Sequence, residues 1–339
     1  MTADLAYYSL VAVYSAMAIY TISFVAFALD LAKRSADSQL AQNRAAAGSA
    51  DASATAAAAS SATVTRSAAG GATVVLDRPV TTQGTVDTSR RASKFERVAM
   101  SMMVLGFVVH VASVVLRGLA AGRVPWANMF EFSLTGTAII VGVYLLVQFF
   151  VPIRYLGAYV MGLNLILLAI GTVNYYVDVV PLPPALQSAW LVIHVFVAIL
   201  GTAFFAIAAG LSAAQLVQAR REQGKLQKAT FLDTMPGSDR LEDQAYRIAL
   251  VGFVLWTFTL IAGAIWAERA WGRYWGWDTK EVWTFIIWVL YAGYIHARAT
   301  RGWRGSRSSW LSIIGFAAVM FNFSVVNIFF KGLHAYSGL

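Results

Sequence analysis

The chain has 339 residues, of which 58% are hydrophobic and 13% are charged, with a formal net charge of +9 and no cysteine. A soluble domain of this composition would have too little polar surface to stay dissolved, and the lack of cysteine excludes disulfides, iron–sulfur clusters and a cysteine nucleophile within the chain. The positive charge would suit nucleic acid in a soluble protein, but the accumulation of Lys and Arg on the cytoplasmic side of membrane proteins explains it more simply. We therefore expect no nucleic-acid partner.

Eight apolar segments are long enough to cross a hydrocarbon core of about 30 Å as helices. Their apolar residues run continuously, unlike the alternating strands of a β-barrel. The first segment, within residues 1–32, lacks the basic start and the cleavage site of a signal peptide, so we interpret it as a transmembrane helix. The sequence predicts an all-α, polytopic membrane protein with about eight transmembrane helices, near residues 6–32, 98–120, 129–151, 154–174, 188–217, 247–267, 282–300 and 309–330.

Residues 33–95 differ in composition from the rest of the chain. Stretches such as AQNRAAAGSADASATAAAASSAT are rich in Ala, Ser, Thr and Gly and hold almost no large apolar side chains. Such a segment buries too little surface to offset the entropy lost on ordering. We predict a disordered cytoplasmic linker that leads into a membrane domain at residues 96–339. An alanine-rich helix is the alternative, which the many Ser, Thr and Gly disfavour.

The distribution of Lys and Arg predicts the orientation in the membrane. With the N-terminus outside, the inner segments carry 20 of the 26 basic residues. The outer segments carry the other six, which are Arg117, Arg123, Arg269, Arg273, Lys280 and Lys331. Because short cytoplasmic loops are enriched in Lys and Arg, we expect both termini to be external, together with the loop between spans six and seven.

The most unusual segment is WGRYWGWDTKEVWTFIIW, which covers residues 271–288. It holds five tryptophans, at positions 271, 275, 277, 283 and 288, with Gly272, Gly276, Asp278 and Glu281 among them. Aromatic belts at membrane interfaces account for a few tryptophans. This density also fits a flat aromatic platform on which a large planar apolar ligand stacks, and composition alone leaves both interpretations open.

Two of the four histidines share the depth of this segment. His194 lies a few residues into the outer end of span five, and His334 lies just beyond the outer end of span eight. Ionisable residues within spans are costly and are usually functional, and two imidazoles on either side of a planar site form a bis-histidine haem iron site. For each histidine alone, a hydrogen-bonded core or interface role is the alternative.

The other two histidines lie deeper. His296 is roughly 20 Å along the helix of span seven, at about 1.5 Å per residue, and His110 is near the middle of span two. Neither reaches the outer segment without a large bend, so they line a second, intramembrane site or bond a neighbouring helix.

Three motifs resemble one known family. WGRYWGWDTKEVW, within residues 268–283, resembles the WWD motif of haem-handling proteins. The closing GLHAYSGL resembles the C-terminal histidine segment of the CcsA/ResC group, named CcsB in some bacteria, and VPWANMFEF is similar to a loop of that group. The resemblance covers residues 98–339 and implies a System II cytochrome c biogenesis protein in the plasma membrane. Such a protein exports haem b and presents it, on the external face, to the CXXCH motif of apocytochrome c for thioether attachment.

The resemblance also implies roles for individual residues. His194 and His334 match two external histidines that ligate haem iron, and His296 matches a transmembrane histidine that holds haem on its way across. The second ligand at His296 would come from a ResB-like (CcsB-like) membrane subunit, and haem-lyase activity, that of a holocytochrome c synthase, would require the complex. The residues expected to position haem for the reaction are Trp271, Trp275, Trp277 and Asp278, with Trp283 as a further haem contact.

Other functions remain as alternatives. A b-type electron carrier would also use histidines and buried haem, but such proteins usually pair both ligands on facing helices within the span. A haem exporter or delivery protein without synthase activity would share the same motifs. A transporter of an unrelated solute would be expected to carry carboxylates near the midplane, whereas Asp30 and Glu131 lie near span ends.

Overall fold

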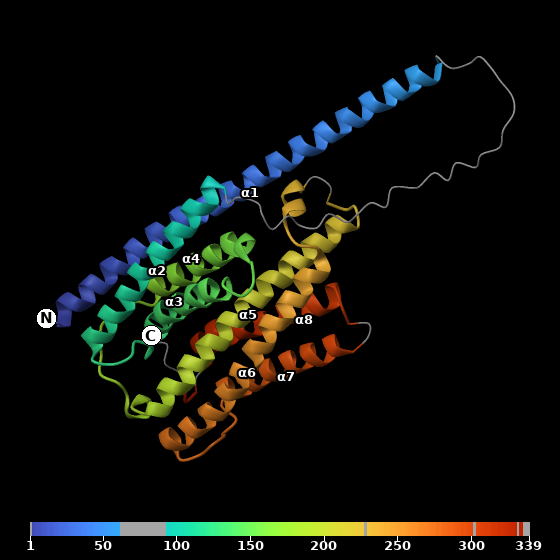
Figure 1. The fold of residues 1–339 in the computed structure, drawn as a ribbon. Helices are drawn as coiled ribbons and strands as arrows, with labels where there is room; N and C mark the ends of the chain where they lie inside the picture. Colours follow the sequence, from blue (N-terminus) through green and yellow to red (C-terminus); the bar gives the residue numbers. More distant parts are fainter. Residues whose placement is uncertain (1, 62–92, 227–228, 301–302, 331, 335–339) are drawn as a thin grey trace.

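A computed structural model describes residues 2–61, 93–226, 229–300, 303–330 and 332–334, and every regular element among them is helical (Figure 1). The elements are α1 (Thr2–Ser61), α2 (Lys94–Ala121), α3 (Met129–Val147), η1 (Arg154–Leu156), α4 (Gly157–Asn174), η2 (Pro184–Leu186), α5 (Ala189–Glu222), η3 (Thr230–Thr234), α6 (Ser238–Trp271), α7 (Thr279–Ala299), α8 (Ser306–Phe321), the π-helix η4 (Asn322–Val326) and α9 (Asn327–Phe329). The predicted all-α class is confirmed.

The long helices alternate in direction, so successive loops fall at opposite ends of the bundle (Figure 1). The start of α1, the α2–α3 loop, the α4–α5 loop, the α6–α7 loop and the end of α9 share one end, which we call the N-terminal end of the bundle. α1 packs along α2, and α5 packs along α6. This arrangement brings together segments from the first, middle and last thirds of the chain.

Seven helical segments in the described part of the chain are long and apolar enough to cross a membrane. They begin at Thr2, Lys94, Met129, Arg154, Ala189, Ser238 and Ser306. The remaining predicted span, residues 282–300, corresponds to α7, which has 21 residues but is not among the seven. The chain is a polytopic membrane protein; that the helices number eight, with both termini external, stays a prediction.

The structure corrects the predicted start of the disordered linker. α1 continues as one helix through Ser61, a length of about 90 Å at the usual rise. Beyond the bundle, Ser35 hydrogen-bonds Thr230 of η3 at 2.7 Å, and Gln42 donates to Asp233 at 2.8 Å. Alanine supports a helix even among Ser and Thr, so the alternative of an alanine-rich helix holds for residues 33–61. The rest of the predicted linker up to residue 92 lies outside the described residues.

Close helix packing depends on small residues. A Cβ on Gly252 of α6 would lie 2.8 Å from the ring of Phe205 on α5, and one on Gly106 of α2 would lie 2.7 Å from Tyr20 on α1. Such contacts let helices approach where lipid gives no hydrophobic drive for association. The bundle is thereby fixed tightly enough to position side chains at its N-terminal end.

Candidate functional site

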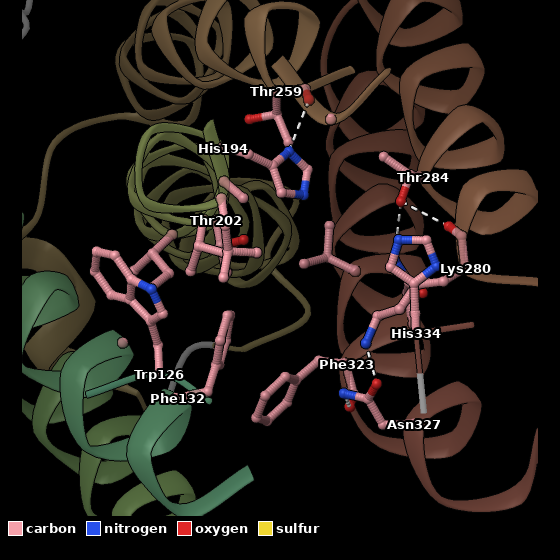
Figure 2. A pocket seen from close by; sticks show the side chains of 18 of the residues that line it. Trp126, Phe132, His194, Thr202, Thr259, Lys280, Thr284, Phe323, Asn327 and His334 are labelled. Atoms are coloured by element: carbon pink, nitrogen blue, oxygen red, sulfur yellow. Dashed lines mark hydrogen bonds between the residues drawn. The ribbon is translucent and has the colours of Figure 1, made fainter. Parts of the chain in front are cut away.

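A cavity of about 220 Å³ lies at the N-terminal end of the bundle (Figure 2). Residues from α3, α5, α6, α7, α8 and the neighbouring loops line it, and most of them are apolar or aromatic. His194 and His334 both face this space, with Trp275 from the tryptophan-rich segment. The structure therefore brings the two predicted external histidines to one site.

His194 is held by the main chain of α6. Its Nδ1 lies 3.0 Å from the carbonyl oxygen of Thr259. Because a carbonyl only accepts, this contact requires the proton on Nδ1 and leaves the Nε2 lone pair free. Gly263 provides the room, since a Cβ there would lie 2.8 Å from Cε1 of the imidazole.

His334 is held by a carboxylate. Its Nδ1 lies 2.7 Å from Oδ2 of Asp278, and Oδ1 of Asp278 accepts from the backbone N–H of Leu333 at 3.1 Å. The hydrogen bond from His334 holds the pKa of Asp278 below its ordinary value. An acceptor at Nδ1 again leaves Nε2 free, which is the arrangement found around histidines that ligate metals.

Trp266 of α6 connects the two histidines. Its ring is stacked against His194, with centroids 5.7 Å apart, and meets His334 edge to face at 5.2 Å. The side chain is buried, and its indole N–H donates to the carbonyl of Ala185 at 3.0 Å. Both imidazoles are thus packed on one fixed aromatic ring.

The predicted tryptophan platform is not a single flat surface. Trp271 meets His334 edge to face at 4.8 Å, and Trp275 meets Trp277 almost perpendicularly at 5.8 Å. Trp283 does not line the cavity and packs against Phe321 of α8, with centroids 4.4 Å apart. The rings therefore form a folded cluster in which Trp271 packs against His334 without lining the cavity, and Trp275 lines the cavity.

The loop between α6 and α7 is fixed by hydrogen bonds. Asp278 caps α7, and Oε2 of Glu281 accepts from the backbone N–H groups of Gly276 and Asp278 at 2.8 and 3.1 Å, which completes a capping box. Trp277 has φ 60°, a conformation that costs of order 1–3 kcal/mol outside glycine. Its side chain is 76% exposed, so the loop directs this ring away from the protein.

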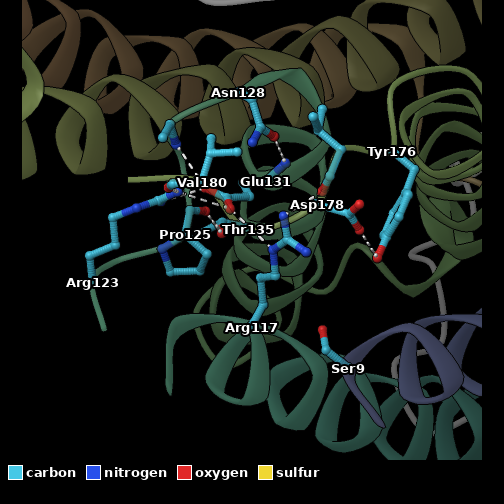
Figure 3. Close-up of polar contacts among 12 residues, drawn as sticks. Ser9, Arg117, Arg123, Pro125, Asn128, Glu131, Thr135, Tyr176, Asp178 and Val180 are labelled. Atoms are coloured by element: carbon cyan, nitrogen blue, oxygen red, sulfur yellow. Dashed lines mark hydrogen bonds and ion pairs between the residues drawn. The ribbon is translucent and has the colours of Figure 1, made fainter. Parts of the chain in front are cut away.

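A buried ion-pair network lies beside the α2–α3 loop (Figure 3). Glu131 of α3 accepts from Arg117 at 3.1 Å and from Arg123 at 2.6 Å, and neither Arg117 nor Glu131 is more than 1% exposed. Arg117 and Arg123 also donate to the carbonyls of Val177 and Val180 in the α4–α5 loop. The network fixes the α2–α3 loop, whose Trp126 and Asn128 line the cavity. Leaving one member of such a buried pair unpartnered typically costs about 3–5 kcal/mol.

The two deeper histidines lie elsewhere, in agreement with their predicted depth. His296 is exposed on α7, and it does not line the cavity. His110 is fully buried in α2, with Nδ1 3.3 Å from the hydroxyl of Tyr20 on α1. Neither joins the site formed by His194 and His334.

Three residues of the site were not predicted from the sequence. Trp266 lies five positions before the tryptophan-rich window, Trp126 lies in the loop after span two, and Lys280 lies inside the motif. Trp266 could have been found by extending the window one helical turn and a half toward the N-terminus. Trp126 belongs to the loop motif VPWANMFEF, but its place in the cavity wall depends on how α3 packs against α5, which hydropathy does not predict.

Two imidazoles with acceptors at Nδ1, an apolar cavity and clustered tryptophans form a site in a polytopic membrane protein that suits a planar metal complex with two axial ligands. Comparison with known proteins identifies the family: residues 98–334 match the cytochrome C assembly protein family, and the chain belongs to it. The family accounts for the WWD resemblance and supports a role in cytochrome c biogenesis and haem handling.

Several relatives carry the name cytochrome c biogenesis protein CcsA. The protein of Guillardia theta is 35% identical over 66% of this chain and 80% of its own length. The protein of Synechococcus sp. (strain RCC307) is 33% identical over 72% of this chain and 86% of its own. The protein of Synechococcus elongatus is 33% identical over 65% of this chain and 81% of its own. The chain is thus a CcsA-type cytochrome c biogenesis protein.

Proposed function

We propose that this chain binds haem b between His194 and His334 and presents it to apocytochrome c for covalent attachment, as the CcsA-like subunit of a cytochrome c synthase. The observation that carries the proposal is the matched tautomer of the two histidines. Each has an acceptor at Nδ1, at 3.0 and 2.7 Å, and each faces the same cavity. Both Nε2 atoms are therefore available to one iron.

Haem is the substrate that supplies the reactive vinyl groups. Each cysteine thiol of the CXXCH segment adds across one vinyl group, so that a carbon–sulfur bond forms and the thiol hydrogen goes to the other vinyl carbon. The chain needs no cysteine of its own for this step, and it has none. Its contribution is to position the reactants and exclude water. His194 and His334 hold the iron, Trp275 lines the space for the ring, and Trp271 packs against His334.

Asp278 acts on the iron through His334, and Trp277 contacts the incoming substrate. Asp278 orients the imidazole of His334 and makes it more basic, as carboxylates do behind metal-bound histidines. The exposed ring of Trp277 extends from the fixed α6–α7 loop, where a docked apocytochrome would meet it. Trp283, packed on Phe321, supports this loop from the helical side.

His296 belongs to an earlier step in this proposal. It is exposed on α7, away from the cavity. An exposed histidine on a transmembrane helix can share a metal complex with a ligand from another chain, here a ResB-like subunit in the plasma membrane. Haem then moves from this inner position to the external cavity, and synthase activity requires the complex.

The test is spectroscopic. His194→Ala and His334→Ala should each severely lower the yield of holocytochrome c while the protein purified with its partner keeps some haem through His296. His296→Ala should lower total haem. Free imidazole should partly restore the two external variants, because a small ligand can fill the vacated axial position from the aqueous side.

Three outcomes separate the alternatives. Normal maturation in His194→Ala and His334→Ala would show that these are ordinary interface histidines. Haem bound at the cavity without any maturation of cytochrome c would favour an electron carrier or a delivery protein. No haem absorbance under any condition would favour a transporter of another solute.

A further inference from the structure

Lys280 presents a positive charge to the cavity. Its side chain leaves the first turn of α7, is partly buried, and lines the same space as His194 and His334 (Figure 2). Its ammonium donates a hydrogen bond to the side-chain oxygen of Asn327. That acceptor is a neutral amide, and Asp278 acts on the ammonium only at longer range, so no described carboxylate contacts the Lys280 ammonium directly.

The other basic side chains that the structure describes at this end of the bundle each lie near a carboxylate. Arg117 and Arg123 share Glu131, Arg269 lies 3.5 Å from Glu268, and Arg273 lies 3.6 Å from Glu281. Among the outer basic residues that the structure describes, Lys280 alone has no carboxylate within 4.0 Å. The nearby carboxylates already have other partners. Asp278 accepts a hydrogen bond from His334, and Glu281 contacts Arg273 and accepts from backbone N–H groups of the α6–α7 loop.

Asn327 holds the ammonium in place. Its side-chain nitrogen donates to the carbonyl of Phe323 at 2.8 Å and lies 3.2 Å from the sulfur of Met129. The π-helix Asn322–Val326, an irregularity often found at functional sites, precedes it and sets its direction. The unpaired charge is thus a fixed feature of the cavity wall.

A partly buried ammonium beside an apolar cavity is costly unless an anion joins it. We propose that Lys280, oriented by Asn327, binds a propionate carboxylate of haem and thereby sets which edge of the ring faces the α7 wall. The inference rests on the proposed function and deepens it. Because the two propionates share one edge of the ring and the vinyl groups lie toward the opposite edge, this contact would direct the vinyl groups away from Lys280 and toward the open part of the cavity.

The test compares two ligands on the full-length protein. Haem and its dimethyl ester have the same ring, iron and vinyl groups, but the ester lacks both carboxylate charges. The wild-type protein should bind haem roughly 10- to 100-fold more tightly than the ester, the size expected of a charge-assisted hydrogen bond. Lys280→Met should lose most of this preference by weakening haem while leaving ester affinity nearly unchanged. Lys280→Arg should retain the preference.

Arg269→Met is the matched control, since it removes an exposed cation from the same end of the bundle without touching the cavity. It should keep the full preference for haem. Equal wild-type affinity for haem and ester would overturn the inference and would mean that another anion, such as a lipid phosphate, pairs with Lys280. Loss of haem and ester to the same extent in Lys280→Met would also overturn it. The wild-type comparison needs no variant, so it stands even if Lys280→Met fails to fold. Binding of neither ligand to the wild type would refute the proposed function itself.

Discussion

Each cavity histidine is oriented by an acceptor at Nδ1, and the two acceptors differ in charge. His194 donates to the neutral carbonyl of Thr259, whereas His334 donates to the carboxylate of Asp278. A carboxylate raises the basicity of the imidazole more than a carbonyl does. In the proposed haem site, His334 would therefore be the more basic ligand and His194 the ordinary one, and the difference comes from residues that would not touch the iron.

The first prediction concerns Asp278. Asp278→Asn removes the negative charge but keeps the size of the side chain, so His334 loses its charged acceptor. We expect haem affinity to fall roughly 10- to 100-fold, as is typical when the partner of a metal-bound histidine is changed. The measurement is a haem titration followed by absorbance. Asp243→Asn, in an exposed ion pair with Arg247, should leave the titration unchanged. Unaltered affinity in Asp278→Asn would contradict the role of this contact.

The second prediction concerns the space around His194. In Gly263→Ala, the new methyl group would lie 2.8 Å from Cε1 and 2.9 Å from Nδ1 of the imidazole, so the ring must move. We expect weaker haem binding with little loss of folded protein. Gly293→Ala is the control, because its Cβ would meet nothing within 4 Å and alanine suits a helix better than glycine. Equal haem spectra for both variants would show that the position of His194 is not critical.

At the scale of whole elements, the sequence predicted the helices more reliably than the loops and contacts. Hydropathy located the spans, because a membrane requires continuous apolar helices. Depth along those spans correctly placed His194 and His334 at one end and His296 away from them. Contacts such as Trp266 against both histidines could not be predicted, since they depend on how α6 rotates against α5.

The extension of α1 is an element whose structure differs from the one that its composition predicted. Its composition indicated disorder, yet the helix continues to Ser61 and contacts η3 through Ser35 and Gln42. The composition indicates how much surface a segment can bury on its own. A helix that already begins in a long apolar span needs no new nucleus and only has to propagate. Helix growth is easier than helix nucleation, so an alanine-rich tail can remain helical after an apolar span.

The third prediction follows for this element. Replacing residues 46–90 with about 12 Gly and Ser residues should leave folding and haem binding unchanged. The replacement keeps Gln42 and spans the return from residue 45 to Ser93 beside Asp30, which is about 22 Å along the helix and needs about seven extended residues. Thermal unfolding and the haem spectrum are the measurements. A second deletion that also removes residues 35–45 should lower the melting temperature, because it removes the contacts with η3.

At the scale of the whole molecule, the same end of the bundle holds the cavity, the tryptophan-rich loop and the few basic residues of the predicted outer segments. These outer segments carry six of the 26 Lys and Arg residues, and the predicted inner segments carry 20. Because the positive-inside tendency counts Lys and Arg rather than net charge, this split predicts that the cavity lies on the external face.

The fourth prediction tests this orientation, and the chain is well suited to the experiment because it has no cysteine. Single cysteines can be introduced at Arg269, which is exposed beside the tryptophan-rich loop, and at Leu40, which is exposed on the extension of α1. The extension of α1 and the α6–α7 loop lie at opposite ends of the bundle (Figure 1). A membrane-impermeant maleimide added to intact cells should label Arg269→Cys. It should label Leu40→Cys only after the membrane is opened.

The two positions serve as controls for each other, because either orientation of the protein places only one of the two cysteines outside the cell. Labelling of Leu40→Cys but not Arg269→Cys in intact cells would place the cavity on the cytoplasmic face. The proposed presentation of haem to an external apocytochrome would then be wrong, although binding between His194 and His334 could still be measured on purified protein. The labelling result thus tests where the reaction occurs separately from whether the cavity holds haem, because haem binding depends on side chains in and around the cavity, whereas delivery depends on the side of the membrane that the cavity faces.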